Sequence, residues 1–199
     1  MKKIIFLLNF IFLFANDLSD AYIASYNYEK NRNYSGALSV LKSVYKENSK
    51  NYTLNLRIAY LFLLNQEYRK SLLFYQRASI ILPFSFEPKF GMMKVYFALK
   101  NYQEILNIGF ALIKRNKYDY YANLYTLQAL IELKKNKEAM DIINKMLDVY
   151  PTDIIYLTYL AKLYESINPK YAKKIYLRSV LLLDPDNISA KMFLKNTKK

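Results

Sequence analysis

The residue types that most often carry out chemistry in enzymes are scarce in this chain. It contains neither histidine nor cysteine, so the commonest general base, the commonest metal ligand and the thiol nucleophile are absent. Paired carboxylates could still hydrolyse a glycoside, and the acidic residues considered for that role are Glu29, Glu87, Glu132 and Glu165. They stand beside lysines, as on a solvated helix face, and nothing in their placement indicates a pair. We therefore expect no enzyme, no metal site, no cofactor and no phosphate-binding loop.

The spacing of the tyrosines and prolines is regular. Tyr34, Tyr68 and Tyr102 follow one another at intervals of 34 residues, and a fixed period of this length is typical of a repeated helical unit. The prolines give a second ruler, because they occur at the same interval or twice that interval, at Pro83, Pro151 and Pro185. The missing member falls at Lys117, where the surrounding helical pattern continues. The sequence therefore predicts five units.

Apolar residues recur within these units when the proline is placed at position 32. Position 8 holds Ser25, Ala59, Met93, Leu127 and Ala161. Position 11 holds Tyr28, Phe62, Tyr96, Leu130 and Tyr164. Position 20, in the second half of the unit, holds Ala37, Ser71, Ile105, Ala139 and Lys173. Each half has apolar residues three or four apart, which predicts two amphipathic helices per unit.

This pattern resembles the tetratricopeptide repeat, a helix-turn-helix unit of 34 residues. The fifth unit, "YLTYLAKLYES", carries the resemblance best, and the second unit follows with Ile58, Ala59, Phe62, Ser71, Tyr75, Ala78 and Pro83. Units three and four depart from the pattern. Met93, Leu127 and Ile105 stand where small residues usually let helices approach, so wider packing or a shifted turn is expected there.

The resemblance implies an all-α fold, an α-solenoid of about five hairpins with a short C-terminal capping helix. The expected domain spans residues 16–199, with units at about 18–51, 52–85, 86–119, 120–153 and 154–187 and a cap at 188–199. Asp153 and Asp186, which follow prolines, are expected to help begin helices. A single hairpin cannot bury both apolar faces, so each unit must stack on the next.

The resemblance also implies that positions 2, 5, 6, 9, 12 and 13 face a concave groove. The candidate partner-binding residues at these positions are Tyr22, Tyr26, Arg57, Tyr60, Phe90, Lys94, Tyr121, Tyr125, Gln128, Tyr159 and Lys162. A groove rich in Tyr and basic residues fits recognition of a protein or peptide. The chain has 21 tyrosines, however, and packing between adjacent helices explains their presence here equally well.

One binding mode of the family is excluded by two residues. Repeats that clamp a C-terminal carboxylate resemble one another in having Lys at position 5 and Asn at position 9 of the first unit. This chain has Tyr22 and Tyr26 there, so we expect no such clamp.

The first residues have the layout of a secretory signal peptide. Lys2 and Lys3 precede an apolar run from Ile4 to Ala15, which is shorter than the roughly 20 apolar residues of a membrane-spanning helix. Cleavage is expected after Ala15, because the alternative site after Ala21 would cut into the first repeat helix. The expected location is the periplasm, or otherwise the exported side of a bacterial cell envelope.

The formal net charge of +14 leaves the class of partner open. A basic protein attracts nucleic acid, anionic lipid or an acidic polymer, but abundant Lys, Asn, Ile and Tyr are also typical of an AT-rich genome. We expect a protein or peptide partner and no nucleic acid. The alternative is an envelope module that binds an anionic glycan or lipid head group through its charge. Neither the oligomeric state nor the pathway follows from the sequence.

Overall fold

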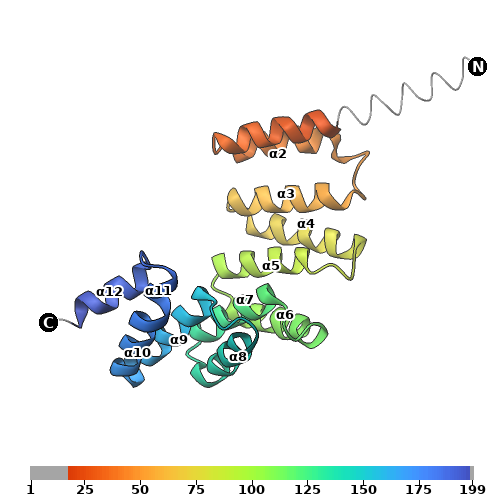
Figure 1. Cartoon of the computed structure of the whole chain (residues 1–199). Helices are drawn as coiled ribbons and strands as arrows, with labels where there is room; N and C mark the ends of the chain where they lie inside the picture. The colour runs from red at the N-terminus through yellow and green to blue at the C-terminus, as the bar shows by residue number, and fades with distance from the viewer. Residues whose placement is uncertain (1–17, 198–199) are drawn as a thin grey trace, which may run out of the picture. The chain divides into compact units, whose positions relative to one another are not determined.

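The structure is a computed structural model that describes residues 18–197. Within that range every regular element is a helix (Figure 1), which confirms the predicted all-α class. The predicted signal peptide, residues 1–15, lies outside the described residues. The chain divides after Lys100 into two compact regions, which we call the N-terminal region and the C-terminal region. No helix in the described range is long and apolar enough to cross a membrane.

In the N-terminal region, up to Lys100, helices that follow one another in the chain pack as antiparallel neighbours. Residues 18–30 are helical, and they are followed by α2 (Tyr34–Tyr45), α3 (Tyr52–Leu64), α4 (Tyr68–Ile81) and α5 (Glu87–Ala98). Helix α3 packs on α2, α4 and α5, and its side chains Ile58 and Phe62 are almost fully buried. Gly91 marks a close approach between α4 and α5, because a Cβ there would lie 2.2 Å from the Tyr75 ring.

The C-terminal region, from Asn101, continues the alternation of helices and short turns. Its helices are α6 (Tyr102–Arg115), α7 (Tyr120–Glu132), α8 (Asn136–Val149), α9 (Ile154–Ile167), α10 (Pro169–Ile175), the π-helical turn η1 (Tyr176–Val180), α11 (Leu181–Leu183) and α12 (Ile188–Asn196). Consecutive helices from α6 to α10 pack against each other. Helix α12 covers the last hairpin, since Ala190 is buried and the Phe193 ring lies 5.3 Å from that of Tyr176. The predicted capping helix is therefore present.

Side-chain caps at repeated positions explain where the helices begin. Position 34 supplies an oxygen that accepts a backbone N–H at the start of α3, α7, α9 and α12, from Asn51, Asp119, Asp153 and Asn187. Such caps satisfy donors that the first helical turn leaves unpaired. The expectation for Asp153 is confirmed. The cap of α12 is Asn187, one residue after the predicted Asp186, whose carboxylate instead pairs with Lys191.

The turns inside the first four hairpins share one backbone conformation. Arg32, Gln66, Lys100 and Lys134 have φ between 54° and 60°, and all four occupy position 15 of their units. Left-handed backbone is unfavourable for residues with a Cβ, so the flanking helices must hold these residues in place. The turns of units three and four therefore match those of units one and two, and the shift considered there does not occur.

The register predicted for the first helices is confirmed at position 8, where all five residues are fully buried. The prediction for the second helix of unit five is wrong. Lys173 is exposed, and the buried small residue is Ala172, because the turn after α9 is shorter. The π-helical turn η1 takes up the missing residue, and Val180 at its end is fully buried.

Candidate functional site

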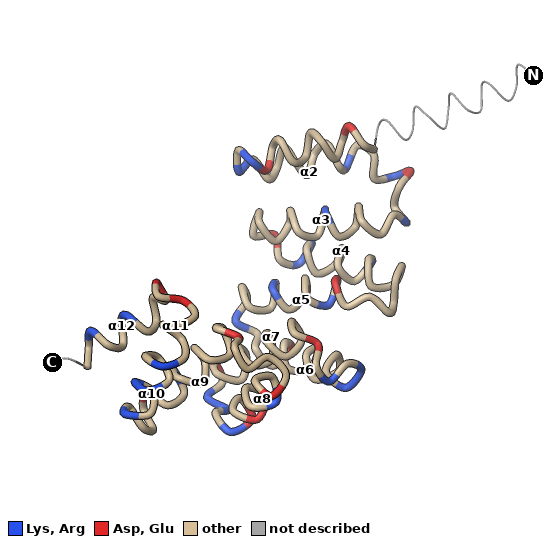
Figure 2. Tube along the Cα trace, viewed as in Figure 1, with Lys and Arg blue, Asp and Glu red and all other residues tan. Residues whose placement is uncertain are grey.

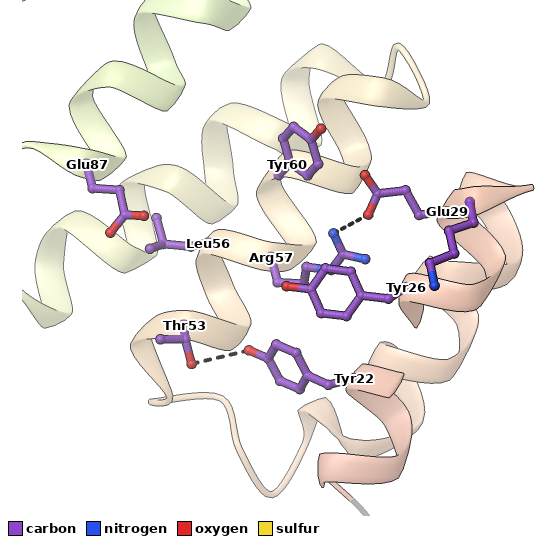
Figure 3. A pocket seen from close by; sticks show the side chains of 9 residues that line it. Tyr22, Tyr26, Glu29, Thr53, Leu56, Arg57, Tyr60 and Glu87 are labelled. Atoms are coloured by element: carbon purple, nitrogen blue, oxygen red, sulfur yellow. Dashed lines mark hydrogen bonds and ion pairs between the residues drawn. The ribbon is translucent and has the colours of Figure 1, made fainter. Parts of the chain in front are cut away.

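A groove of about 720 Å³ lies in the N-terminal region, between the helix at residues 18–30 and α3 (Figure 3). Its lining consists of Tyr22, Tyr26, Glu29, Lys30, Thr53, Leu56, Arg57, Tyr60 and Glu87. Glu87 comes from the start of α5. All nine residues occupy positions 2, 5, 6, 9, 12 or 13 of their units, which form one face of each first helix because they recur every three or four residues. This agrees with the positions that the resemblance assigned to the groove.

Arg57 is the most deeply buried charged group of the groove. Its residue is 8% exposed, and its guanidinium forms an ion pair with Glu29. Nε and Nη2 also donate hydrogen bonds to Ser25 Oγ, at 3.3 and 3.2 Å. The Cζ atom lies 3.8 Å from the centroid of the Tyr26 ring, a favourable cation–π arrangement. Arg57 therefore joins α3 to the helix at residues 18–30, and its charge is already neutralised.

The charges of the groove balance. Lys30 and Arg57 contribute two cations, and Glu29 and Glu87 contribute two carboxylates. The Glu87 carboxylate also accepts a hydrogen bond from Tyr52. The expectation of a basic groove is wrong for this part of the chain, because its two cations are matched by two carboxylates. Figure 2 shows Lys and Arg at many other places along the described chain.

The tyrosines present both ring faces and hydroxyl groups to the groove. Tyr26 is 51% and Tyr60 is 37% exposed, whereas the half-buried Tyr22 donates a hydrogen bond to Thr53 Oγ1 at 3.2 Å. Burial raises the pKa of Tyr22. Burial, followed by the nearby Glu29 carboxylate, raises the pKa of Tyr60. Both hydroxyls therefore stay protonated at neutral pH and remain hydrogen-bond donors.

The groove offers groups that can bind a ligand. Tyrosine rings and Leu56 offer apolar contact area, and hydroxyl and carboxylate groups at the rim offer hydrogen bonds to a backbone. Among the described residues no cluster of His, Cys, Asp or Glu is arranged to hold a metal ion. An extended chain of alternating apolar and polar groups would match this lining.

Phe90 and Lys94 do not line this groove. Phe90 belongs to α5 and makes an edge-on contact with Phe86, with ring centroids 6.2 Å apart. Lys94 is exposed on the same helix. Six of the candidates lie in the N-terminal region. The structure brings four of them together, namely Tyr22, Tyr26, Arg57 and Tyr60.

The candidates of the C-terminal region form contacts on α7 and α9. The Tyr121 and Tyr125 rings stack with centroids 6.4 Å apart. Gln128 donates a hydrogen bond to the Tyr159 hydroxyl at 3.0 Å, and Lys162 Nζ lies 5.7 Å from the centroid of the Tyr159 ring. The Gln128–Tyr159 hydrogen bond joins the first helices of neighbouring hairpins, whereas the Tyr121–Tyr125 and Lys162–Tyr159 contacts each lie within one helix.

Five groove residues were not among the candidate partner-binding residues: Glu29, Lys30, Thr53, Leu56 and Glu87. The signal was present, because each stands at one of the six groove positions. They were passed over since a lone acidic, basic or aliphatic residue on a helix does not by itself indicate binding.

Comparison with known proteins gives matches at the level of structure. No family model matches the chain, and no curated protein matches it. A tetratricopeptide repeat protein from Parabacteroides merdae superposes with a TM-score of 0.77 at 16% identity, covering 89% of this chain and 71% of the other.

Two further solved structures agree. MamA from Desulfovibrio magneticus has a TM-score of 0.71 at 15% identity, with coverage of 86% of this chain and 97% of the other. YrrB, described as a TPR protein with an unusual peptide-binding site, has a TM-score of 0.65 at 13% identity, with coverage of 86% and 88%. The chain therefore has the all-α helical-hairpin fold of the tetratricopeptide repeat proteins.

Proposed function

We propose that this protein is a non-catalytic scaffold that binds an extended segment of a protein partner in the groove of its N-terminal region. The observation that carries the proposal is the lining of that groove, where three tyrosines surround a pair of neutralised charges. Aromatic side chains supply much contact area for little loss of side-chain entropy, and they are enriched at binding hot spots. The peptide-binding site named for YrrB supports this use of the fold.

The rival function is that of an envelope module that binds an anionic glycan or lipid head group through its positive charge. A polyanion is bound mainly through unneutralised cations, and in this groove the Arg57 charge is paired with Glu29. The balanced lining therefore favours a peptide over a polyanion at this site. Nucleic acid is disfavoured for the same reason.

Truncation of Tyr60 should weaken a captured partner by about 2 kcal/mol, as loss of an aromatic anchor does. Tyr60→Ala removes a ring that is 37% exposed in the groove, and binding by the unchanged protein should persist at moderate salt. The measurement is a pull-down from envelope extract, followed by titration of the captured partner at low and high salt.

The matched control for this titration is Tyr118→Ala. Tyr118 is 44% exposed and does not line the groove, so its truncation should leave the affinity unchanged. Binding that salt abolishes and that Tyr60→Ala does not affect would instead support the polyanion function.

We also propose that the protein is exported to a bacterial envelope, as a component of envelope assembly or secretion, and that its first segment is removed. Lys2, Lys3 and the short apolar run that ends at Ala15 support this proposal. Intact-mass measurement of protein recovered from the native envelope should give a chain that begins after Ala15. Retention of Met1 would contradict cleavage.

A further inference from the structure

The outward face of the second helix in the last hairpin combines exposed cations with exposed leucines. We call it the basic–apolar row, formed by Lys170, Lys173, Lys174, Leu177, Arg178 and Leu182. All six residues are exposed, and none belongs to the groove of the N-terminal region. Figure 2 shows the cations of this segment along α10.

The helical period places these residues on one side. Lys170, Lys174, Arg178 and Leu182 follow one another every four residues, and Lys173 and Leu177 form the adjacent line. The opposite side faces the core, where Ala172, Tyr176 and Val180 are fully buried. The row is therefore an amphipathic surface whose first half is basic and whose second half is apolar.

Among the described residues, no ion pair joins a carboxylate to a cation of the row. Glu165 accepts a hydrogen bond from the buried Tyr176 hydroxyl at 2.6 Å. Asp186 forms an ion pair with Lys191 on α12, and Asp184 accepts a hydrogen bond from Asn187. Those three are the acidic residues between positions 154 and 197, where seven Lys and Arg residues occur.

Large apolar side chains are exposed both in the row and on α12. Leu177 is 44% and Leu182 is 74% exposed. On α12, Ile188 is 74% and Met192 is 62% exposed, one helical turn apart. Large apolar side chains left in water at this density mark a surface that meets something apolar.

We infer that the basic–apolar row docks on an anionic lipid surface. Lysine is depleted in protein–protein interfaces, whereas helices that lie in a membrane interface carry Lys and Arg on one part and Leu on the other. A soluble polyanion would be held by the cations but would leave the leucines in water. A lipid surface satisfies both halves, because head groups attract the cations and the acyl boundary buries Leu177 and Leu182.

The test is co-flotation with vesicles, using protein that lacks residues 1–15 and so retains every helix that the structure describes. Vesicles of phosphatidylcholine alone should bind weakly, and vesicles that also contain phosphatidylglycerol should bind well. The triple change Lys170→Ser, Lys174→Ser and Arg178→Ser should lower the affinity about a hundredfold. The double change Leu177→Ser and Leu182→Ser should lower it about tenfold.

A charge-matched control is Lys46→Ser, Lys50→Ser and Lys114→Ser, which removes three exposed cations elsewhere. It should bind nearly as well as the unchanged protein, and circular dichroism should show that all variants stay helical. Equal losses in the two triple variants would overturn the inference, because the attraction would then be diffuse. Unchanged binding by the leucine variant, or competition by polyphosphate that removes all binding, would assign the row to a soluble polyanion. Either result leaves peptide binding by the groove unaffected.

Discussion

Ala161→Trp should unfold the last hairpin, whereas Lys137→Ala should leave the stability of the protein unchanged. Ala161 lies in α9 with no exposed surface, in a cluster with Leu157, Tyr176 and Val180. Overpacking a core typically costs about 1 to 3 kcal/mol, and tryptophan adds far more volume than one or two methylene groups. We therefore expect a loss at or above the upper end of that range.

The loss should be local, because each repeat contacts only its neighbours. Amide hydrogen exchange should show lost protection in α9 and α10 with protection kept in α6, while thermal unfolding gives the overall change. Lys137 is exposed on α8 and serves as the surface control. If the two variants melt at the same temperature, the register assigned to α9 is incorrect.

Removal of the Arg57 side chain should detach the first hairpin from the second. Arg57→Met leaves the Glu29 carboxylate without its ion pair and Ser25 Oγ without its two donors. Removing one partner of a buried pair typically costs about 3 to 5 kcal/mol, and we expect about 3 kcal/mol because Glu29 is 23% exposed.

The double variant Arg57→Met and Glu29→Gln gives the matched comparison. It removes both charges, so it should be more stable than Arg57→Met alone. Urea unfolding followed by hydrogen exchange of residues 18–45 measures both variants. A double variant less stable than the single one would show that the Glu29 charge is not the source of the loss.

The helices and their core faces could be predicted because two kinds of regularity agree. The 34-residue period fixed the units, and the apolar positions within each unit fixed the buried face, as the full burial of Met93 and Leu127 shows. Burial of these large residues also shows why the departure from small residues was tolerable. The fold accommodates the volume of both side chains at position 8 without exposing them.

The groove could be predicted as a set of positions but not as a chemistry. Tyr26 and Tyr60 face it as expected. The use of Arg57 could not be foreseen, because its partners Ser25 and Glu29 lie about 30 residues earlier in the chain and no local pattern links them. A cation that the sequence offered to a ligand is used inside the fold.

The fifth unit was misread for a different reason. The prolines keep their 34-residue spacing through it, so a ruler based on them hides any pair of internal changes that cancel. The buried small residue comes eight residues after Tyr164, at Ala172, but nine residues after Leu130, at Ala139. Only a structure shows that the difference is made up within the same helix.

The π-helical turn at Tyr176–Val180 also determines which side chains of the last repeat face the core. Loss of one residue from the turn before α10 would by itself rotate the rest of the helix by about 100° relative to its neighbours. Val180 would then leave the core, and the outward side chains would be turned toward it. An added residue within the helix reverses the rotation only from that point onward. The short turn before α10 and the π-helical turn therefore act as a pair, since together they leave both Ala172 and Val180 in the core.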